Sequence, residues 1–393
     1  MKQLTRLFIP ICLETLFYML SGMVDTLMLS AVGDYAVGAV GTANSYIGIF
    51  IIMFSIISSG MVSVMTQNIG AGRPGVAYQA RQLGLLFNAV AGVLMAVFLF
   101  SGAGAILRMV GIADALYEPA LIYLKIVGGG CILNAVIPIF SSYLRAFGYT
   151  KQPLYATIVG NIANFVMNAV FLFVLHKGVA GVAAATVISK ILNLCIVLYF
   201  SHKLISAKNS TERIANKTVL GQIVKVGLPS ACETALYNVA MMLVIRFLNQ
   251  MDAEGLNVTA RSYTATISNF SYCVGAALAQ ANAIMTGWHI GAGELEECDR
   301  GTKRAAFVGV CVAVCMETAI VLGSGFIMPL FTDNPEMTAL VRKLLAIDIV
   351  LEIGRVTNLV FGQALKTSGD AVFPAVIAAV FMFVFAVGGT WLF

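Results

Sequence analysis

Hydrophobic residues fill most of the chain in long runs, and short stretches of glycine, proline or charged residues separate the runs. Eleven runs come near or exceed the ~20 residues that an α-helix needs to cross a bilayer. Their approximate bounds are 7–30, 37–66, 83–107, 119–144, 153–175, 178–201, 222–249, 258–286, 303–326, 338–365 and 371–393. The pattern predicts an all-α protein with eleven membrane-spanning helices. Gly128-Gly-Gly130 predicts a pliable point in the fourth helix.

Charged residues between the runs differ in sign from one loop to the next. One side of the predicted membrane carries Lys2, Arg6, Arg73, Arg81, Arg145, Lys151, Lys203, Lys208, Arg213, Lys217, Arg300, Lys303, Arg304 and Lys366. The other side carries Asp34, Asp114, Glu118, Asp252, Glu254, Asp333 and Glu336, with Arg108 and Lys177 as exceptions. Because basic loops stay in the cytoplasm, the pattern predicts a multi-pass protein of the plasma (inner) membrane with a cytoplasmic N-terminus.

Three sequence landmarks occur twice, in the same order, at offsets of 219, 221 and 221 residues. They are Pro10-Ile-Cys-Leu-Glu14-Thr-Leu-Phe-Tyr18 with Pro229-Ser-Ala-Cys-Glu233-Thr-Ala-Leu-Tyr237, Gly70-Ala-Gly72 with Gly291-Ala-Gly293, and Leu144…Gly148…Pro153 with Leu365…Gly369…Pro374. Such repetition indicates a duplicated unit. An even number of six helices per unit makes the copies parallel repeats.

The repeat predicts the domain organisation. Residues 1–201 form an N-lobe of helices 1–6, residues 202–221 a cytoplasmic linker, and residues 222–393 a C-lobe of helices 7–11. The partner of helix 178–201 is expected to begin near residue 399, beyond Phe393, so the twelfth helix is missing from this chain. A fragment or truncated gene product is the favoured explanation over natural loss of that helix.

Composition restricts the class of protein further. Hydrophobic residues make up 59% of the chain and charged residues 11%, against about 25% charged residues in soluble domains. The net charge of +5 is therefore interpreted as an orientation signal and not as a nucleic-acid signal. The chain has no GxxxxGK[ST], HExxH, GxSxG or CxxC motif, so it is not expected to be an ATPase, an enzyme or a zinc protein. With these classes excluded, the sequence predicts a secondary transporter.

Ionisable and amide side chains inside the N-lobe helices are costly, which makes them candidates for function. Glu14 and Asp25 are eleven residues apart, so they share one helix face about 16 Å apart. Asp25 is a candidate cation or proton site, and the alternative is a hydrogen-bonded carboxyl that serves packing. Asn161, Asn164 and Asn168 share a face of helix 153–175 and either join helices or coordinate a cation.

The C-lobe carries a different set of polar side chains. Asp348, Glu352 and Arg355 form one stripe at spacings of four and three, in which Arg355 pairs with either acid; the pair is either functional or a structural ion pair. Glu233 is the repeat mate of Glu14. The remaining intramembrane polar residues are Lys190, Arg246, Gln280 and Glu317.

The sequence resembles the MATE (multidrug and toxic compound extrusion) transporters along essentially its whole length. The matching segments are Val24-Asp25-Thr26 followed by Gly33, Gln67…Gly70-Ala71-Gly72, Leu144-Arg-Ala-Phe-Gly148, Gly160-Asn161…Asn164…Asn168 and Gly178-Val-Ala-Gly181-Val-Ala-Ala-Ala-Thr186. The resemblance implies two six-helix lobes that form a V around a central cavity, and export of cationic or amphipathic compounds by Na⁺ or H⁺ antiport.

The resemblance also implies roles for individual residues. Asp25 matches the helix-1 acid that binds the coupling ion, which makes Asp25 a candidate Na⁺ ligand. Asn164, Asn168 and Thr186 match further N-lobe ligands. Many members carry Asp where this chain has Asn168, which leaves Asp25 as the only fixed charge of the cluster. The expected substrate or second-lobe site consists of Glu14, Glu233, Asp348, Glu352, Arg355 and Gln280.

The favoured function is a monomeric, cofactor-free multidrug or toxin exporter coupled to Na⁺ or H⁺, with the lipid bilayer and small molecules as its only partners. A flippase for lipid-linked saccharides is the second hypothesis, but such proteins present a strongly basic cavity, and here the intramembrane acids are at least as prominent as Arg246 and Arg355. An inactive truncated remnant is the third.

Overall fold

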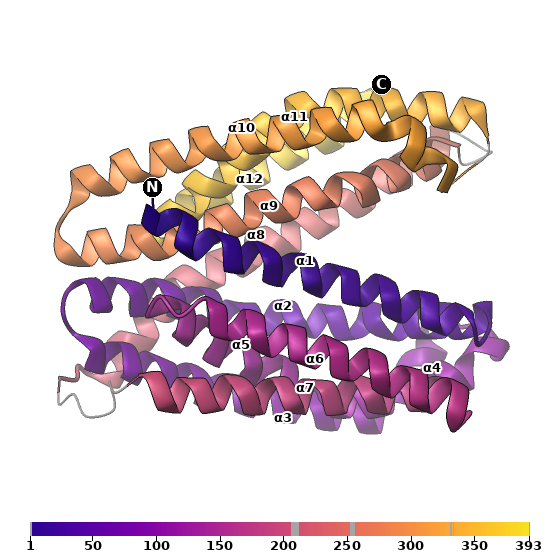
Figure 1. Cartoon of the computed structure of the whole chain (residues 1–393), viewed down its shortest axis with the longest axis horizontal. Coiled ribbons are helices and arrows are strands. Elements are labelled where there is room, and N and C mark those ends of the chain that lie inside the picture. The colour runs from indigo at the N-terminus through magenta and orange to yellow at the C-terminus, as the bar shows by residue number, and fades with distance from the viewer. Residues whose placement is uncertain (1, 206–211, 252–255, 331, 333, 393) are drawn as a thin grey trace. The chain divides into compact units, whose positions relative to one another are not determined.

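The structure is a computed structural model that describes residues 2–205, 212–251, 256–330, 332 and 334–392. Among these residues no β-strand occurs, and almost all lie in helices (Figure 1). The helices are α1 (Lys2–Ser30), α2 (Asp34–Gly70), α3 (Pro74–Val110), α4 (Asp114–Gly129), α5 (Cys131–Ala146), α6 (Lys151–Ala169), α7 (Gly178–Leu204), α8 (Asn216–Met251), α9 (Leu256–Ala292), α10 (Leu295–Ile327), α11 (Pro335–Ser368), α12 (Val372–Phe381) and α13 (Gly388–Leu392). Two π-helical segments, Val170–Val174 and Met382–Val387, extend α6 and join α12 to α13, and a 3₁₀ turn, Met328–Leu330, ends α10.

Each of the eleven predicted spans coincides with a helix or with joined helices. The predicted span 119–144 is divided between α4 and α5, which meet at Gly130 with a bend of 41°, as the triple glycine predicts. Among the described residues, eight helices, or nine spans if the bent pair counts as one, are long and apolar enough to cross a membrane. The long helices α9 and α11 are not among these spans.

The chain divides into two compact units. The first unit is Leu13–Gly227, and the second unit combines Met1–Cys12 with Leu228–Phe393. The unit boundaries therefore fall within α1 and α8. The division at 201 and 222 stays a prediction, and the linker residues 206–211, including Lys208, lie outside the described residues, as do Asp252, Glu254 and Asp333.

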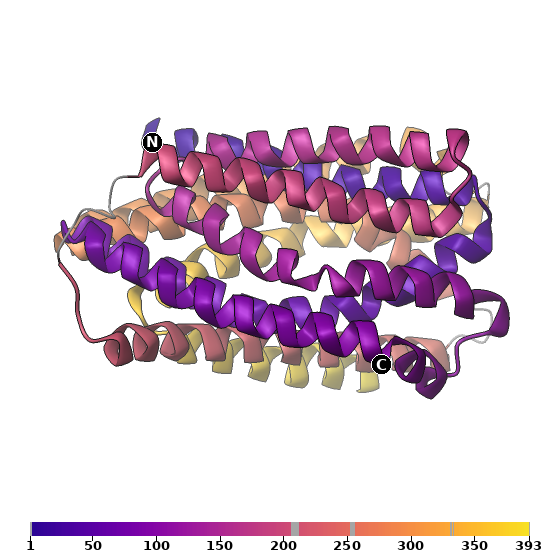
Figure 2. The ribbon, with the colours of Figure 1, turned by 90° about the horizontal axis from the view of Figure 1, so that it is seen from below.

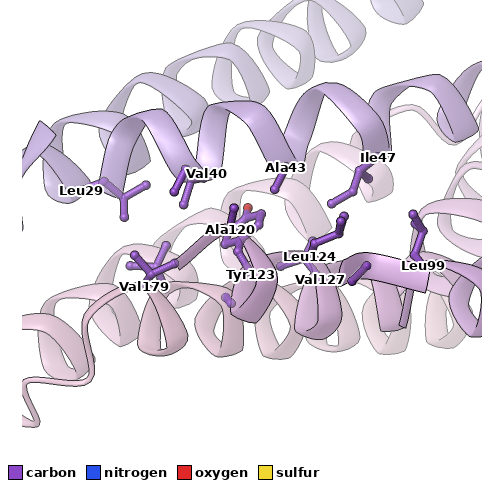
Figure 3. Packing of buried hydrophobic residues seen from close by; sticks show 14 of the residues in the cluster. Leu29, Val40, Ala43, Ile47, Leu99, Ala120, Tyr123, Leu124, Val127 and Val179 are labelled. Carbon is purple, nitrogen blue, oxygen red and sulfur yellow. The ribbon is translucent and has the colours of Figure 1, made fainter. Parts of the chain in front are cut away.

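The first unit is held together by an apolar core between α2, α3, α4 and α7. Figure 3 shows Val40, Ala43 and Ile47 of α2 facing Tyr123 and Leu124 of α4. α6 and α7 run side by side (Figure 2). Because lipid and protein core are equally apolar, these side chains stabilise the bundle mainly through close packing.

Two glycines of the first unit allow its helix backbones to touch. A Cβ atom added at Gly60 of α2 would lie 1.9 Å from the carbonyl oxygen of Ile223, and one at Gly227 would lie 1.8 Å from that of Ile56. Both separations are far below van der Waals contact, so only glycine fits at these positions. The contact joins α2 to the first turns of α8.

In the second unit, α9, α10 and α11 pack on one another. The N-terminal turns of α1 contribute Leu4, Leu7 and Ile11 to the same core, beside Leu278 and Ile284 of α9. The start of α1 therefore belongs structurally to the second unit.

The duplicated landmarks adopt the same local structure in both units. Gly72 and Gly293 have φ of 73° and 79°, and Gly148 and Gly369 have φ of 83° and 98°. This left-handed region is favourable only for glycine, which ends a helix there. The repeated glycines thus mark repeated turns, after α2 and α9 and after α5 and α11.

Candidate ion-binding clusters

Asp25 and two asparagines form a polar cluster inside the first unit. Asn168 Nδ2 donates to Asp25 Oδ1 at 2.7 Å and to Asn164 Oδ1 at 3.1 Å. Asn168 is fully buried and Asn164 nearly so. Asn168 Oδ1 has no hydrogen-bond partner among the described residues, so a buried oxygen is available beside the carboxylate. The structure therefore brings Asp25 of α1 together with Asn168 and Asn164 of α6.

The other predicted polar residues of this unit have separate contacts. Thr186 Oγ1 donates to the Val182 carbonyl of its own helix at 2.9 Å. Asn161 Nδ2 donates to the Phe17 carbonyl at 2.9 Å, so this amide joins α6 to α1.

Two further side chains belong to the Asp25 cluster. Tyr123 of α4 lies beside Thr186 and Asn44 and interacts electrostatically with Asp25. Lys190 of α7 also interacts electrostatically with Asp25 and donates to Asn134 Oδ1 at 2.8 Å. A second ionisable side chain therefore lies near Asp25. Lys190 lies one helical turn after Thr186, a spacing of four that signals a shared face; nothing in the sequence singles out Tyr123.

Glu14 and Glu233 lie in ion pairs. Glu14 Oε1 is 2.5 Å from Arg145 Nη2 of α5. Glu233 Oε2 is 2.8 Å from Lys366 Nζ of α11. The repeat relationship between the two glutamates therefore extends to their basic partners.

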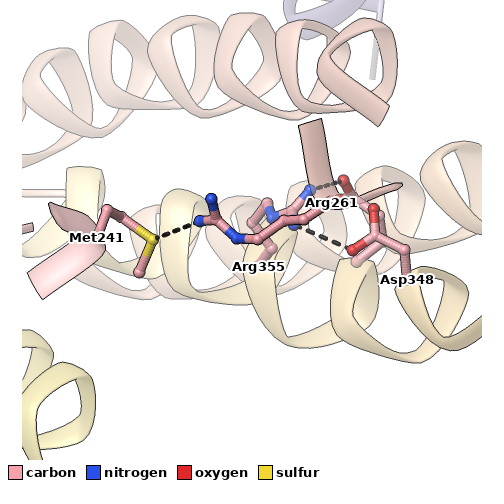
Figure 4. Close-up of polar contacts among 5 residues, drawn as sticks. Met241, Arg261, Asp348 and Arg355 are labelled. Carbon is pink, nitrogen blue, oxygen red and sulfur yellow. Dashed lines mark hydrogen bonds and ion pairs between the residues drawn. The ribbon is translucent and has the colours of Figure 1, made fainter. Parts of the chain in front are cut away.

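A second acidic cluster lies within the second unit. Arg355 Nη1 is 2.5 Å from Glu352 Oε1, and Arg355 Nη2 is 3.2 Å from Asp348 Oδ1, which is the pairing that the spacing predicts. Figure 4 shows the Asp348 contact, and beside it Arg261, whose Nη2 lies 3.2 Å from Met241 Sδ. Glu317 of α10 joins the two acids, with ligand oxygens of all three within 4.8 Å of one another. Gln280 lies half-buried on α9.

Comparison with known proteins finds a family model and a relative that match most of the chain. The MatE family profile matches the chain twice, over residues 10–170 and 229–392. The uncharacterized transporter YisQ of Bacillus subtilis (strain 168) is 32% identical over 379 residues, which is 95% of this chain and 83% of YisQ. The double match coincides with the repeat offset of the sequence.

Solved structures of similar fold cover 98% to 100% of the chain. A crystal structure of a mutant of the Vibrio cholerae MATE transporter VcmN has a TM-score of 0.88 at 18% identity and covers 100% of this chain and 89% of its own. A crystal structure of MATE in the straight conformation has a TM-score of 0.85 at 21% identity and covers 98% of this chain and 87% of its own. At these identities the similarity establishes the fold.

Proposed function

The chain belongs to the MatE family of transporters, and we propose that it is a cation-coupled exporter in which Asp25 holds the coupling ion. The observation that supports this assignment is the partly buried hydrogen bond from Asn168 of α6 to Asp25 of α1. Members of the family are transporters and not enzymes. The protein therefore binds its ligands reversibly and does not make covalent bonds.

The Asp25 cluster offers what a small cation needs. Asp25 supplies a negative charge, and Asn168 Oδ1 supplies a buried oxygen without a partner in the described part of the chain. Carboxylate and amide oxygens are the preferred ligands of hard cations. A proton would bind Asp25 alone, whereas Na⁺ would use the amide oxygen as well. Replacement of Asn168 is therefore expected to affect Na⁺ binding more than proton binding.

Ion binding changes the charge balance of α1 and α7. Without the ion, Lys190 is the positive group that interacts with Asp25. When an ion or a proton neutralises Asp25, its attraction to Lys190 is lost and its hydrogen bond from Asn168 of α6 is weakened. A ligand shifts a conformational equilibrium only through its different affinity for the two states, and this exchange of partners supplies such a difference.

The same charge supports the proposed substrate class and topology. An ionised carboxylate inside a membrane bundle attracts cationic and amphipathic compounds, which compete with the coupling ion. The basic residues of alternate loops support a cytoplasmic N-terminus in the plasma (inner) membrane. We propose a monomer as the transporting unit.

Dye efflux from proteoliposomes tests the function. Transport of a cationic dye is driven separately by a Na⁺ gradient and by a pH gradient, with the parent protein, Asp25→Asn and the control Asp299→Asn. Asp299 is exposed and pairs with Lys303 on the surface of α10, so its replacement leaves efflux intact. Asp25→Asn is expected to abolish gradient-driven efflux at normal protein levels, and unchanged efflux would refute the proposal.

A further inference from the structure

An arginine near the start of α3 lies among three aromatic rings of the first unit. The guanidinium carbon of Arg81 is 4.5 Å from the ring centroid of Tyr78, 5.0 Å from that of Tyr143 and 5.4 Å from that of Phe140. Arg81 is half-buried, and its Nε has no hydrogen-bond acceptor among the described residues. The ion pairs of the described residues do not include Arg81. The rings attract the charge, but they leave its hydrogen-bond donors available for an anion.

The hydroxyl of Tyr143 is a second donor at the same place. Tyr143 of α5 is 1% exposed, and within the described ranges its hydroxyl oxygen has no partner, whereas buried tyrosine hydroxyls normally find one. Tyr143 interacts electrostatically with both Arg81 and Tyr78, so the three polar groups lie together. The Tyr78 hydroxyl accepts from Gln82 Nε2 at 3.2 Å, which leaves its own proton to donate. A guanidinium and two hydroxyls can thus donate to one shared acceptor.

The depth of this cluster matches that of lipid headgroups. α3 has 37 residues and is therefore about 55 Å long. Because the hydrocarbon core of a bilayer is ~30 Å thick, a centred helix of this length extends about 12 Å beyond the core at each end. Arg81 follows Pro74, the first residue of α3, by seven positions, or about 10 Å. Its guanidinium consequently lies at the level of lipid phosphates, on the side that we propose to be cytoplasmic.

We propose that Arg81 and Tyr143, with Tyr78 beside them, bind the phosphate group of an anionic phospholipid between α3 and α5. The planar guanidinium suits phosphate because it presents parallel N–H donors to two oxygens of one group. The described residues place no carboxylate in an ion pair with Arg81, so the cluster offers no partner for the ammonium group of a zwitterionic headgroup. A basic pocket between helices at the cytoplasmic surface is a recurrent site for anionic headgroups.

The surface of α3 beyond Arg81 favours a lipid over a free phosphate ion. Leu86, Val90 and Val97 are exposed, and their spacings of four and seven put them on one face of the helix. This apolar stripe begins about one turn after Arg81 and extends towards the membrane centre. The acyl chains of a lipid bound at Arg81 can lie along it, whereas free phosphate makes no use of it.

Native mass spectrometry of the purified, delipidated chain tests the proposal. The protein is titrated in detergent with phosphatidylglycerol and, separately, with phosphatidylcholine. We expect one phosphatidylglycerol per chain to bind at least tenfold more tightly than phosphatidylcholine, and Arg81→Gln to remove this preference. Tyr143→Phe removes one hydroxyl, keeps the ring and every charge, and is expected to weaken phosphatidylglycerol binding about tenfold, as loss of one hydrogen bond to a charged group does.

The matched control is Arg73→Gln, which removes the same charge from an exposed arginine at the N-cap of α3 and is expected to keep the lipid. Equal losses in Arg73→Gln and Arg81→Gln would overturn the proposal, because surface charge alone would then attract the lipid. Unchanged phosphatidylglycerol affinity in Tyr143→Phe would overturn it too, and this variant keeps the test decisive if Arg81→Gln does not fold.

Inorganic phosphate separates the two sources of a phosphate group. Millimolar phosphate is expected to leave the lipid bound, because a free ion has no contact with the apolar stripe. Displacement of phosphatidylglycerol by inorganic phosphate would assign the site to a free anion and overturn the assignment to a lipid. The measurement uses neither an ion gradient nor a dye, so its outcome is independent of ion coupling at Asp25.

Discussion

Arg145 Nη2 lies 2.5 Å from Glu14 Oε1, and this ion pair joins α1 to the last turn of α5. Both side chains are less than one-fifth exposed, at 16% and 12%. In such surroundings each charge depends on its partner, because water is not available to replace it. The pair is therefore a fixed connection of the first unit.

The second unit contains the same connection. Glu233 lies 2.8 Å from Lys366, in the last turn of α11. The glutamates are 219 residues apart in the sequence and their basic partners 221, which are the offsets of the repeat. Each basic residue precedes a glycine turn, at Gly148 and at Gly369. The duplication therefore preserved an ion pair together with the turn that positions it.

Removal of one partner of the Glu14 pair is expected to destabilise the protein more than removal of both. Arg145→Ala leaves Glu14 charged and partly buried, which costs about 3–5 kcal/mol in buried pairs. The double variant Glu14→Gln with Arg145→Ala leaves no unpaired charge and regains part of that loss. Thermal unfolding of the purified protein measures both, with the exposed Arg300→Ala as control. Equal melting temperatures for the single and double variants would contradict this interpretation.

The close approach of α2 and α8 makes a second prediction about stability. Gly60→Ala introduces a Cβ that would lie 1.9 Å from the Ile223 carbonyl oxygen, so the helices must separate. We expect a lower melting temperature, because overpacking costs about 1–3 kcal/mol. Gly221→Ala is the matched control: its Cβ meets nothing within 4 Å, and alanine is the better helix former by up to ~1 kcal/mol. A destabilised control with a stable Gly60→Ala would show that this contact is absent.

Most of the fold follows from the sequence because hydrophobic length and glycine turns are local signals. The apolar runs predict the helices, and the triple glycine predicts the bend at Gly130. Family membership and the solved structures confirm the all-α duplicated fold and the assignment as a transporter. What the sequence does not contain is the division of α1, whose first turns pack with α9. Only tertiary contacts decide which unit a helix end joins.

The candidate site follows from the sequence in part. Asp25 and Asn168 are predictable because intramembrane polar groups are costly and share helix faces. Tyr123 escapes this reasoning because it carries no charge, and Lys190 is recognisable as an intramembrane charge four residues after Thr186 although its place near Asp25 is not. Their importance appears only when helices bring them beside an acid. Glu317 is visible in the sequence, but its acidic neighbours come from another helix.

Asn168 distinguishes a metal ion from a proton at Asp25. Asn168→Ala removes the buried oxygen and the donor to Asp25 Oδ1, so Na⁺-driven efflux is expected to fall at least tenfold, with pH-driven efflux less affected. Asn161→Ala is the control on the same helix, since Asn161 contacts the Phe17 carbonyl. Rates of dye efflux under each gradient provide the measurement. An equal loss for both driving ions would indicate that Asn168 serves packing.

Lys190 tests whether an internal cation balances Asp25. Lys190→Met removes the positive charge that interacts with Asp25 and nearly preserves side-chain length. A cation, whether substrate or coupling ion, then meets a stronger attraction at Asp25 and dissociates more slowly. Efflux of a cationic dye is expected to show a lower KM together with a lower kcat, a combination that indicates tighter ground-state binding.

The control for this charge is Lys225→Met, which changes an exposed lysine of α8 and is expected to leave both constants unchanged. Lys190→Arg restores the charge and is expected to return KM towards that of the parent protein. A purely structural role predicts a different outcome, because loss of the bond to Asn134 would lower the amount of folded protein with KM unchanged. A lower kcat at parental KM would therefore contradict the role of Lys190 as the counter-ion of Asp25.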